Sequence, residues 1–346
     1  MRFLFRLYAG GFLAVGVSTQ LLMAQDPVKR TESTIEADGT AYVTRVVEVP
    51  QTISIEAQKS LVAQHKPNEP HPRQARQMSS DATLAAYPAK IEFSTIEGVP
   101  VSVVAPTTIP AEKAGRVLIN LHGGGFTSDS GSLTESLPLA NLTRTRVISV
   151  LYRLSPAYPF PAPVEDVVAV YKSLLKTYDA RNIAIYGSSA GAVLTGEVAV
   201  KLKQLGLRLP GALGIFSGGG DFTQTGDSQQ IYGVRGLAGD PDTRPKGVQW
   251  LAVYVGSANP RDPVLSPFFA DLHGMPPTLF MTSTRDMLLS DTTILHRAFL
   301  RAGADASLVV FEGLNHCFWY DPGLPESHEA NQIMADFFDR HLGTAR

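Results

Sequence analysis

The sequence predicts an α/β fold, with a mostly parallel central sheet, helices on both faces and a small cap. Short apolar runs alternate with helical stretches along most of the chain, and two glycine-rich motifs begin where such a run ends. This alternation is typical of parallel strands joined by helical crossovers, which bury both faces of a sheet. The expected strands are 117–121, 146–151, 182–186, 211–216, 278–282 and 306–311, and the expected helices are 163–178, 190–205, 290–302 and 325–342.

An antiparallel hairpin is expected before the first parallel strand. Residues 90–96 and 99–104 alternate between apolar and polar side chains, as strands with one buried face do. The dipeptide Glu97-Gly98 between them supplies the glycine that tight turns favour. We therefore expect the sheet to begin with two antiparallel strands.

Two of the expected helices begin with recognisable signals. Pro163 precedes Glu165 and Asp166, and a proline suits the first turn because the N–H groups there have no partner within the helix. Ser290 and Asp291 likewise precede an amphipathic run, and acidic side chains are favoured at the positive end of the helix dipole.

The composition describes a globular protein without an obvious charged partner. The chain has 346 residues, of which 44% are hydrophobic and 18% charged, with a formal net charge of −2. Nothing in this balance indicates binding to nucleic acid. The single cysteine, Cys317, excludes an intrachain disulfide, and the eight histidines lack the His-Glu-x-x-His spacing of a zinc site. We expect no metal and no cofactor.

Residues 1–24 have the pattern of a secretory signal peptide. Arg2 and Arg6 precede an apolar stretch at 7–23, and the small residue Ala24 comes before a polar run. Leucine instead of alanine stands three positions before a cut after Ala24, so an uncleaved anchor stays open as an alternative. We expect export to the periplasm or the medium, with no stable membrane span after cleavage.

Residues 25–88 are expected to form an N-terminal extension that contributes to the cap, ahead of the main α/β domain at 89–346. The extension is polar and interrupted by prolines, and no long helical or alternating pattern precedes Ile91. One catalytic domain with a small cap is the simplest organisation for this length.

The run Gly-Ser-Ser-Ala-Gly at 187–191 lies between an expected strand and an expected helix, which is the context of a nucleophile elbow. Small residues at both ends of this motif let strand and helix approach closely around a sharp turn. Ser189 would then project its hydroxyl above the sheet. Because such a pattern also occurs by chance in glycine-rich loops, a second motif is needed to support the interpretation.

That second motif is His-Gly-Gly-Gly-Phe at 122–126, which directly follows the strand expected at 117–121. Backbone N–H groups of a glycine-rich loop can point at a substrate carbonyl and stabilise the negative charge that develops on its oxygen. We assign the oxyanion hole to the N–H groups of Gly124, Gly125 and Ala190, and support of the loop to His122 and Gly123.

A serine nucleophile needs a base, and the base must be oriented by a carboxylate. In hydrolases with such an elbow the chain order is serine, then aspartate or glutamate, then histidine. Asp286 follows the strand at 278–282, and His316 follows the strand at 306–311. We therefore expect a catalytic triad of Ser189, Asp286 and His316.

Other candidates fit these roles less well. Asp291 is the alternative carboxylate, but it stands behind Ser290 at an expected helix start, where acids are common. Cys317 lacks an elbow and is better explained as a small apolar filler. The remaining histidines considered lie in expected helices or before a turn: His273, His296, His328 and His341.

With these residues, the chain resembles the bacterial hormone-sensitive-lipase-like branch of the α/β-hydrolases from about residue 88 to residue 342. Beyond the two glycine motifs, further segments are similar to those of this family. They are Tyr-Arg-Leu-Ser-Pro at 152–156, the proline run at 159–163, the loop at 221–228 and the segment 261–267 that leads to Pro276 and Pro277.

Two positions depart from the family pattern. Ser188 stands before the nucleophile, where aspartate is usual in one large branch, and Ala157 stands where an acidic residue commonly follows the Tyr-Arg segment. The first departure leaves the subfamily open. The second weakens inferences about hydrogen bonds that support the site.

The resemblance implies an α/β-hydrolase fold and hydrolysis of small carboxylic esters through an acyl-enzyme on Ser189. It also implies a cap in which residues 26–88 and 218–256 bound the acyl and alcohol pockets. An amidase or exopeptidase on the same fold is the enzymatic alternative, and a non-catalytic receptor on a hydrolase scaffold is the other. The sequence leaves the oligomeric state open, including a homodimer.

Overall fold

The computed structural model describes residues 32–64, 74–238 and 251–343, and the chain divides into two compact units, residues 1–48 and 49–346. In the first unit, β1 (Glu32–Ile35) and β2 (Ala41–Thr44) form an antiparallel hairpin in which Glu32 pairs with Thr44. The signal peptide predicted at 1–24 lies outside the described residues.

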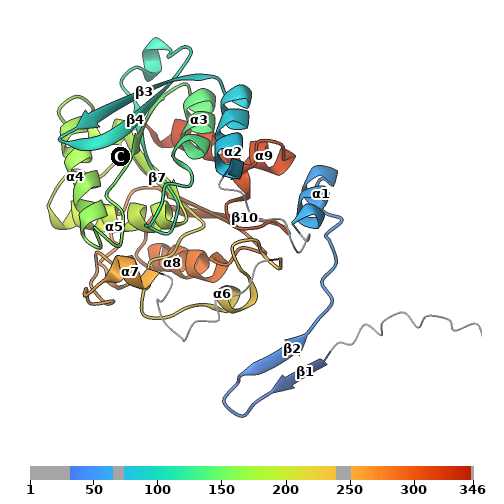
Figure 1. Ribbon diagram of the computed structural model, residues 1–346. Coiled ribbons are helices and arrows are strands. Elements are labelled where there is room, and N and C mark those ends of the chain that lie inside the picture. The colour runs from blue at the N-terminus through green and yellow to red at the C-terminus, as the bar shows by residue number, and fades with distance from the viewer. Residues whose placement is uncertain (1–31, 65–73, 239–250, 344–346) are drawn as a thin grey trace, which may run out of the picture. The chain divides into compact units, whose positions relative to one another are not determined.

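The second unit contains an eight-stranded sheet with the order β10-β9-β8-β7-β5-β6-β4-β3 (Figure 1). The six strands from β10 to β6 are parallel, and β4 and β3 continue the sheet as the antiparallel hairpin expected from the sequence. The predicted α/β fold is therefore confirmed. The strands are β3 (Ala89–Ile96), β4 (Val99–Pro106), β5 (Val117–Leu121), β6 (Arg146–Val150), β7 (Ile183–Ser188), β8 (Ala212–Phe216), β9 (Thr278–Ser283) and β10 (Ala306–Phe311).

The strand order reverses at β5, because β6 lies on one side of it and β7 on the other. In such sheets the ligand site lies beyond the carboxyl ends of the strands at this reversal. Leu121, the last residue of β5, pairs with Gly187 in β7. The two glycine-rich motifs therefore leave neighbouring strands at the same edge of the sheet.

Helices cover both faces of the sheet (Figure 1). One face packs against α4 (Ala162–Leu174), α5 (Ala190–Gln204) and α8 (Leu289–Arg301). The other packs against α3 (Ser132–Thr143) and α9 (Pro325–His341). Ile119 belongs to the first apolar cluster and Leu118 to the second, as the alternation of a strand requires. Two short helices, α6 (Asp227–Ile231) and α7 (Ala252–Val255), lie in the connection between β8 and β9.

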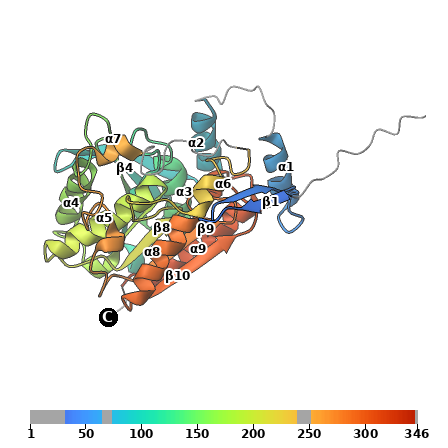
Figure 2. The same cartoon turned by 90° about the horizontal axis from the view of Figure 1, so that it is seen from below.

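The extension contains two helices that the sequence did not predict, α1 (Ile55–Ala63) and α2 (Gln74–Ala86). In Figure 2 they lie on the side of the unit away from α4 and α5. Among the side chains of these helices that the structure describes, the buried ones are Ala57 and Thr83, which are small or polar, so no buried apolar stripe distinguishes these helices. Residues from Val49 onward thus fold as part of the second unit.

Polar contacts hold the extension to α9. The Ser54 backbone N–H and hydroxyl donate to the Glu326 carboxylate over 2.6 and 2.8 Å, and the Ser54 hydroxyl oxygen accepts from the N–H of Ala57 at the start of α1. The Tyr87 hydroxyl lies 2.5 Å from Nδ1 of His328. These contacts connect segments more than 240 residues apart.

Helix α3 was also missed, since no helix was expected between the strands at 117–121 and 146–151. Pro138 lies inside it and cannot donate a backbone hydrogen bond to the preceding turn, and serine and threonine are frequent in it. Nine of its residues are buried, so it has no polar face that would reveal a helical period.

None of the described helices is both long and apolar enough to cross a membrane.

We expect Ser54→Ala to loosen α1 while leaving the sheet intact. The change removes an N-terminal cap, which typically contributes about 1 kcal/mol, so amide hydrogen exchange in α1 should quicken by about five-fold or more. Mass-spectrometric exchange on residues 55–63 measures this. Ser60→Ala in the same helix is the matched control, and equal exchange in both variants would contradict the anchoring role of Ser54.

Candidate active site

Ser189 lies at the turn between β7 and α5, in a backbone conformation that few side chains adopt. Its φ is 56° and its ψ is −122°, a sparsely populated region for a residue with a Cβ atom. The turn is held by the Ser189 N–H, which donates to the carbonyl oxygen of Phe216 over 2.9 Å. The structure therefore has the sharp strand-to-helix turn expected from the sequence.

The glycines that flank Ser189 allow the close approach behind this turn. A Cβ atom built on Gly187 or Gly191 would meet the carbonyl oxygen of Leu121 closer than real Cβ atoms approach any atom. Neither glycine needs a positive φ. They are required here because the end of β5 leaves no room for a side chain.

Ser189, His316 and Asp286 lie in one hydrogen-bonded chain. Nε2 of His316 is 2.9 Å from the Ser189 hydroxyl oxygen, and Nδ1 of His316 is 2.8 Å from Oδ1 of Asp286. Asp286 follows β9 and His316 follows β10, and both side chains are buried. The structure brings together the three residues that the sequence analysis selected.

Asp286 is surrounded by donors. The N–H of Leu288 donates to Oδ1 over 2.8 Å, and the hydroxyls of Ser217 and Thr282 donate to Oδ2. Burial raises the pKa of this carboxyl, but attraction to His316 and these hydrogen bonds outweigh it and hold the pKa below its usual value. Asp286 is therefore ionised at neutral pH.

The charge of Asp286 acts in turn on His316. Burial lowers the pKa of the imidazole, but the neighbouring Cys317 and Asp286 raise it well above its ordinary value. We attribute this direction to Asp286, because burial raises the pKa of the Cys317 thiol and keeps it uncharged. The imidazole can therefore accept a proton from Ser189 and hold it as a stabilised cation.

The alternative carboxylate, Asp291, lies in the first turn of α8 and makes no hydrogen bond to His316. Burial raises the pKa of Asp291 to about 7. Of the four other histidines considered from the sequence, three have partners elsewhere and one is exposed. His296 contacts the Ala306 carbonyl oxygen, His328 contacts Tyr87, His341 packs on Phe337, and His273 is exposed.

In the loop after β5, the carbonyl oxygens of Gly123 and Gly124 both accept hydrogen bonds. The Gly123 oxygen accepts from Nδ1 of His122 over 2.8 Å and from the N–H of Ser130 over 3.2 Å. The Gly124 oxygen accepts from the N–H groups of Thr127 and Ser128 over 3.1 and 3.2 Å. Gly124 has a φ of 122°, a conformation that favours glycine.

The N–H groups of the expected oxyanion hole are not engaged. Across the described ranges, with their gaps at 65–73 and 239–250, none of Gly124, Gly125 and Ala190 donates a hydrogen bond to another residue. Three such donors at the edge of the sheet that carries Ser189 can bind a negatively charged oxygen.

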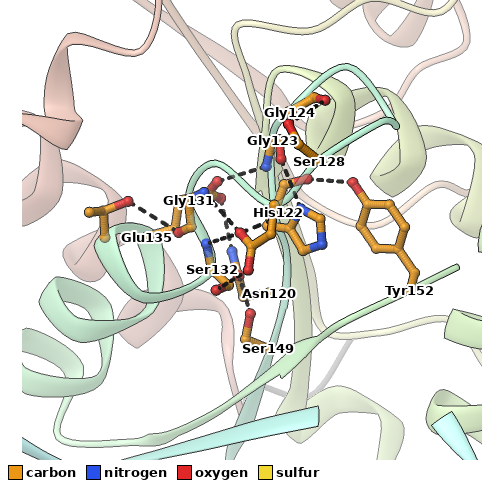
Figure 3. A network of polar contacts seen from close by, with 12 residues as sticks. Asn120, His122, Gly123, Gly124, Ser128, Gly131, Ser132, Glu135, Ser149 and Tyr152 are labelled. Carbon is orange, nitrogen blue, oxygen red and sulfur yellow. Dashed lines mark hydrogen bonds and ion pairs between the residues drawn. The ribbon is translucent and has the colours of Figure 1, made fainter. Parts of the chain in front are cut away.

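His122 supports this loop as a neutral side chain (Figure 3). Its ring stacks on Tyr152 at a centroid distance of 4.2 Å, and the Tyr152 hydroxyl donates to the His122 carbonyl oxygen over 2.6 Å. Burial lowers the pKa of His122, so the imidazole carries no charge at neutral pH.

Two residues that hydrogen-bond to groups of the site, Ser217 and Glu135, were not predicted from the sequence. Ser217 directly follows β8, so its place at a strand end was a signal that could have identified it. Glu135, whose carboxylate accepts from the N–H of Gly123 over 3.0 Å, lies in the helix that was not predicted. Nothing in the local pattern distinguishes it from a surface glutamate.

Ser188, which departs from the family pattern, has a hydrogen-bond partner in the structure. The Ser188 hydroxyl oxygen accepts from the indole N–H of Trp319 over 3.1 Å. This contact connects the residue before the nucleophile to the segment after His316, so a serine is well accommodated where one branch of the family has aspartate.

A groove of about 670 Å³ runs from His316 to the extension. Its lining includes Leu61 and Gln64 of the α1 region, Arg235, and residues 314–318 and 320–324. The extension thus borders a space that reaches the histidine.

Comparison with known proteins agrees with this geometry. Residues 118–320 match the α/β hydrolase fold family. The chain belongs to this family. An acetyl-hydrolase from Streptomyces hygroscopicus is 33% identical over 68% of this chain and 79% of its own length.

Solved structures place this α/β-hydrolase in the hormone-sensitive-lipase-like branch. An esterase from the bacterial hormone-sensitive lipase family is 30% identical, with a TM-score of 0.73 over 84% of this chain and 99% of its own. An esterase/lipase from an uncultured bacterium is 26% identical, with a TM-score of 0.72 over 84% and 100%. The resemblance stated from the sequence is therefore confirmed.

In the part of the chain that the structure describes, no group of three or more histidine, cysteine, aspartate or glutamate side chains could hold a metal ion.

Gly191→Ala is expected to destabilise the α/β-hydrolase unit, since the new methyl group would collide with the backbone of Leu121. Overpacking of this kind typically costs about 1–3 kcal/mol, and backbone atoms yield less than side chains. Urea unfolding measures the loss. Gly115→Ala is the control, because its methyl group would find only Asn182 at 3.9 Å. Equal stability of the two variants would refute the close approach at the elbow.

Proposed function

We propose that the protein hydrolyses small carboxylic esters through an acyl-enzyme formed on Ser189. The observation that carries the proposal is the hydrogen-bonded chain from Asp286 through His316 to the Ser189 hydroxyl, with contacts of 2.8 and 2.9 Å. Membership in the hormone-sensitive-lipase-like branch supports the same activity.

In the first half of the proposed cycle, the Ser189 oxygen attacks the ester carbonyl while His316 takes the hydroxyl proton. Asp286 stabilises the resulting imidazolium, which then gives its proton to the departing alcohol. The N–H groups of Gly124, Gly125 and Ala190 bind the oxyanion. Each donor of this kind contributes about 100- to 1000-fold to the rate.

In the second half, His316 takes a proton from water, and the resulting hydroxide attacks the acyl group on Ser189. The tetrahedral intermediate collapses with return of the proton from His316 to the serine oxygen, and the carboxylic acid leaves. No step needs a metal or a cofactor, because the histidine supplies both proton transfers.

We place the preferred acyl groups among the short ones. The acetyl-hydrolase similarity supports a small acyl group, whereas the groove beside His316 has room for a larger part of the substrate. We also propose export of the protein on the basis of the N-terminal pattern at 1–24, and the state of association is left to measurement.

Ser189→Ala should lower turnover of p-nitrophenyl acetate by about a million-fold, because loss of a triad nucleophile removes the acyl-enzyme route. Steady-state release of p-nitrophenol by the wild type and the variant measures this. A long-chain ester tests the acyl preference in the same assay. Turnover that survives the substitution would refute the assignment of Ser189.

A second assay with p-nitroacetanilide, the amide that corresponds to p-nitrophenyl acetate, distinguishes esterase from amidase activity. Cleavage of the anilide at a rate comparable with the ester would favour an amidase. A folded wild-type protein that cleaves neither substrate would contradict the proposal and favour a binding role.

The pH profile should report the ionisation of His316. The base works only when neutral, so kcat/KM is high above its pKa and falls as the pH decreases through that value. Because the charge of Asp286 raises this pKa, the fall should be centred above the ordinary imidazole value of about 6.5. Asp286→Asn should move the centre to lower pH and reduce kcat by about ten-thousand-fold.

Asp291→Asn is the matched control for this profile. Asp291 is a second buried carboxyl group, five residues after Asp286 in the sequence, and it has no hydrogen bond to His316. Its kcat and its acid limb should stay close to those of the wild type. A large loss in Asp291→Asn together with a small loss in Asp286→Asn would exchange the roles of the two carboxylates.

A further inference from the structure

A buried carboxyl group lies beneath the oxyanion loop and takes no part in the proposed cycle. Glu135 is in the first turn of α3 and is only 4% exposed. Burying a carboxyl group costs free energy unless hydrogen bonds compensate. Its position and partners therefore call for an explanation.

Three donors converge on the two oxygens of this carboxyl group, and Figure 3 labels Glu135 together with two of the donor residues, Asn120 and Gly123. Oε1 accepts from the N–H of Gly123 over 3.0 Å and from the Tyr320 hydroxyl over 2.5 Å. Oε2 accepts from the side-chain amide of Asn120 over 2.9 Å, and Asn120 in turn accepts from the Ser149 hydroxyl.

These donors belong to three different parts of the site. Asn120 lies in β5, Gly123 begins the oxyanion loop, and Tyr320 lies four residues after His316. We propose that Glu135 is a positioning residue that orients the oxyanion loop and connects it to the segment carrying His316. The inference rests on the proposed ester hydrolysis, because it concerns the efficiency of that site.

The planarity of the peptide bond explains why Gly123 matters. The carbonyl of Gly123 and the N–H of Gly124 share one peptide plane and point in opposite directions. His122 and Ser130 hold that carbonyl, and Glu135 holds the N–H on the other side of Gly123. Because the N–H and the carbonyl oxygen of Gly123 are both hydrogen-bonded, the two peptide planes that meet at Gly123 are fixed. This also fixes the direction of the Gly124 N–H.

Close packing around Gly131 keeps the carboxyl group in place. A Cβ atom on Gly131 would collide with Oε1 of Glu135 and would lie 2.6 Å from the Tyr320 hydroxyl oxygen. Gly123 is also tight, since a Cβ atom there would lie 3.0 Å from the same hydroxyl. The glutamate, the tyrosine and the loop thus fit together without spare volume.

We expect the acceptor position of Oε1, rather than the charge of Glu135, to hold the loop. Burial raises the pKa of this carboxyl group to about 8 despite its three donors, so the neutral form predominates near pH 7. A neutral carboxyl group, like a glutamine side chain, still presents one carbonyl oxygen to the N–H of Gly123. An acceptor at Oε1 should therefore be sufficient for positioning.

The decisive comparison is between Glu135→Leu and Glu135→Gln. Leucine removes the acceptor at similar volume, and we expect kcat for p-nitrophenyl acetate to fall about 10- to 100-fold with KM changed less than about three-fold, as for a slightly misplaced catalytic group. The affinity for a trifluoromethyl ketone, which mimics the oxyanion, should fall by the same factor as kcat. Glutamine should restore kcat to within about three-fold of the wild type.

Glu197→Leu is the matched control. Glu197 is fully buried and accepts from the Tyr254 hydroxyl, but it lies within α5, and among the described residues it has no hydrogen bond to Gly123 or to the other glycines of the loop. It should lose stability without a comparable loss of kcat. If both leucine variants keep wild-type kcat, or if both lose kcat only in proportion to the unfolded fraction, Glu135 is a structural residue and the proposal is wrong.

Gly131→Ala provides a second route if Glu135→Leu does not fold. It keeps every polar group but displaces the carboxyl group from Gly123, so kcat should again fall with little change in KM, whereas Gly115→Ala should have no effect. Wild-type kcat in Gly131→Ala would overturn the proposal.

Hydrogen exchange separates this inference from the proposed function. The peptide 122–131 should exchange faster in Glu135→Leu than in the wild type or Glu197→Leu, whether or not the substrate has been chosen correctly. A wild-type protein without esterase turnover would refute the function. Unchanged exchange in this peptide would refute the positioning.

Discussion

The contact on which the site depends is the approach of the nucleophile turn to the end of β5. Gly187 and Gly191 meet the backbone of Leu121 without room for a methyl group. This contact places the start of α5 beside the loop that leaves β5, so the Ala190 N–H and the glycine N–H groups lie at one edge. The reversal of strand order at β5 makes the approach available, because β6 and β7 lie on opposite sides of that strand.

Two buried carboxyl groups then organise the surroundings in similar ways. Asp286 accepts hydrogen bonds from Ser217, Thr282 and Leu288, and its Oδ1 also accepts one from His316. Glu135 collects donors from Asn120, Gly123 and Tyr320. In both cases the hydrogen bonds oppose the effect of burial on the pKa, but burial prevails at Glu135 and not at Asp286, so the two pKa values shift in opposite directions. The cationic partner of Asp286 accounts for that difference, because Glu135 has only neutral donors.

The fold and the hydrogen-bonded grouping of Ser189, His316 and Asp286 could be predicted because their signals are local. The glycines of the turn at 187–191 and of the loop at 122–126 are adjacent in sequence, and each follows an uninterrupted apolar strand. Asp286 and His316 also follow strands, so the parallel order brings them to the same edge. In contrast, α1 and α3 lack an amphipathic pattern, since α1 buries one small side chain and α3 is buried almost throughout.

The sequence by itself determined the parallel α/β sheet and the family, since strand patterning and glycine requirements act over a few neighbouring positions. It also selected Ser189, Asp286 and His316, which the structure joins in one hydrogen-bonded chain. Only the tertiary structure decided that Glu135 lies under the loop, that Ser217 supports Asp286 and that α1 borders the groove at His316. The physical reason is that a buried polar group is defined by its partners. Those partners lie as far away as 185 residues, between Glu135 and Tyr320, and no local pattern records them.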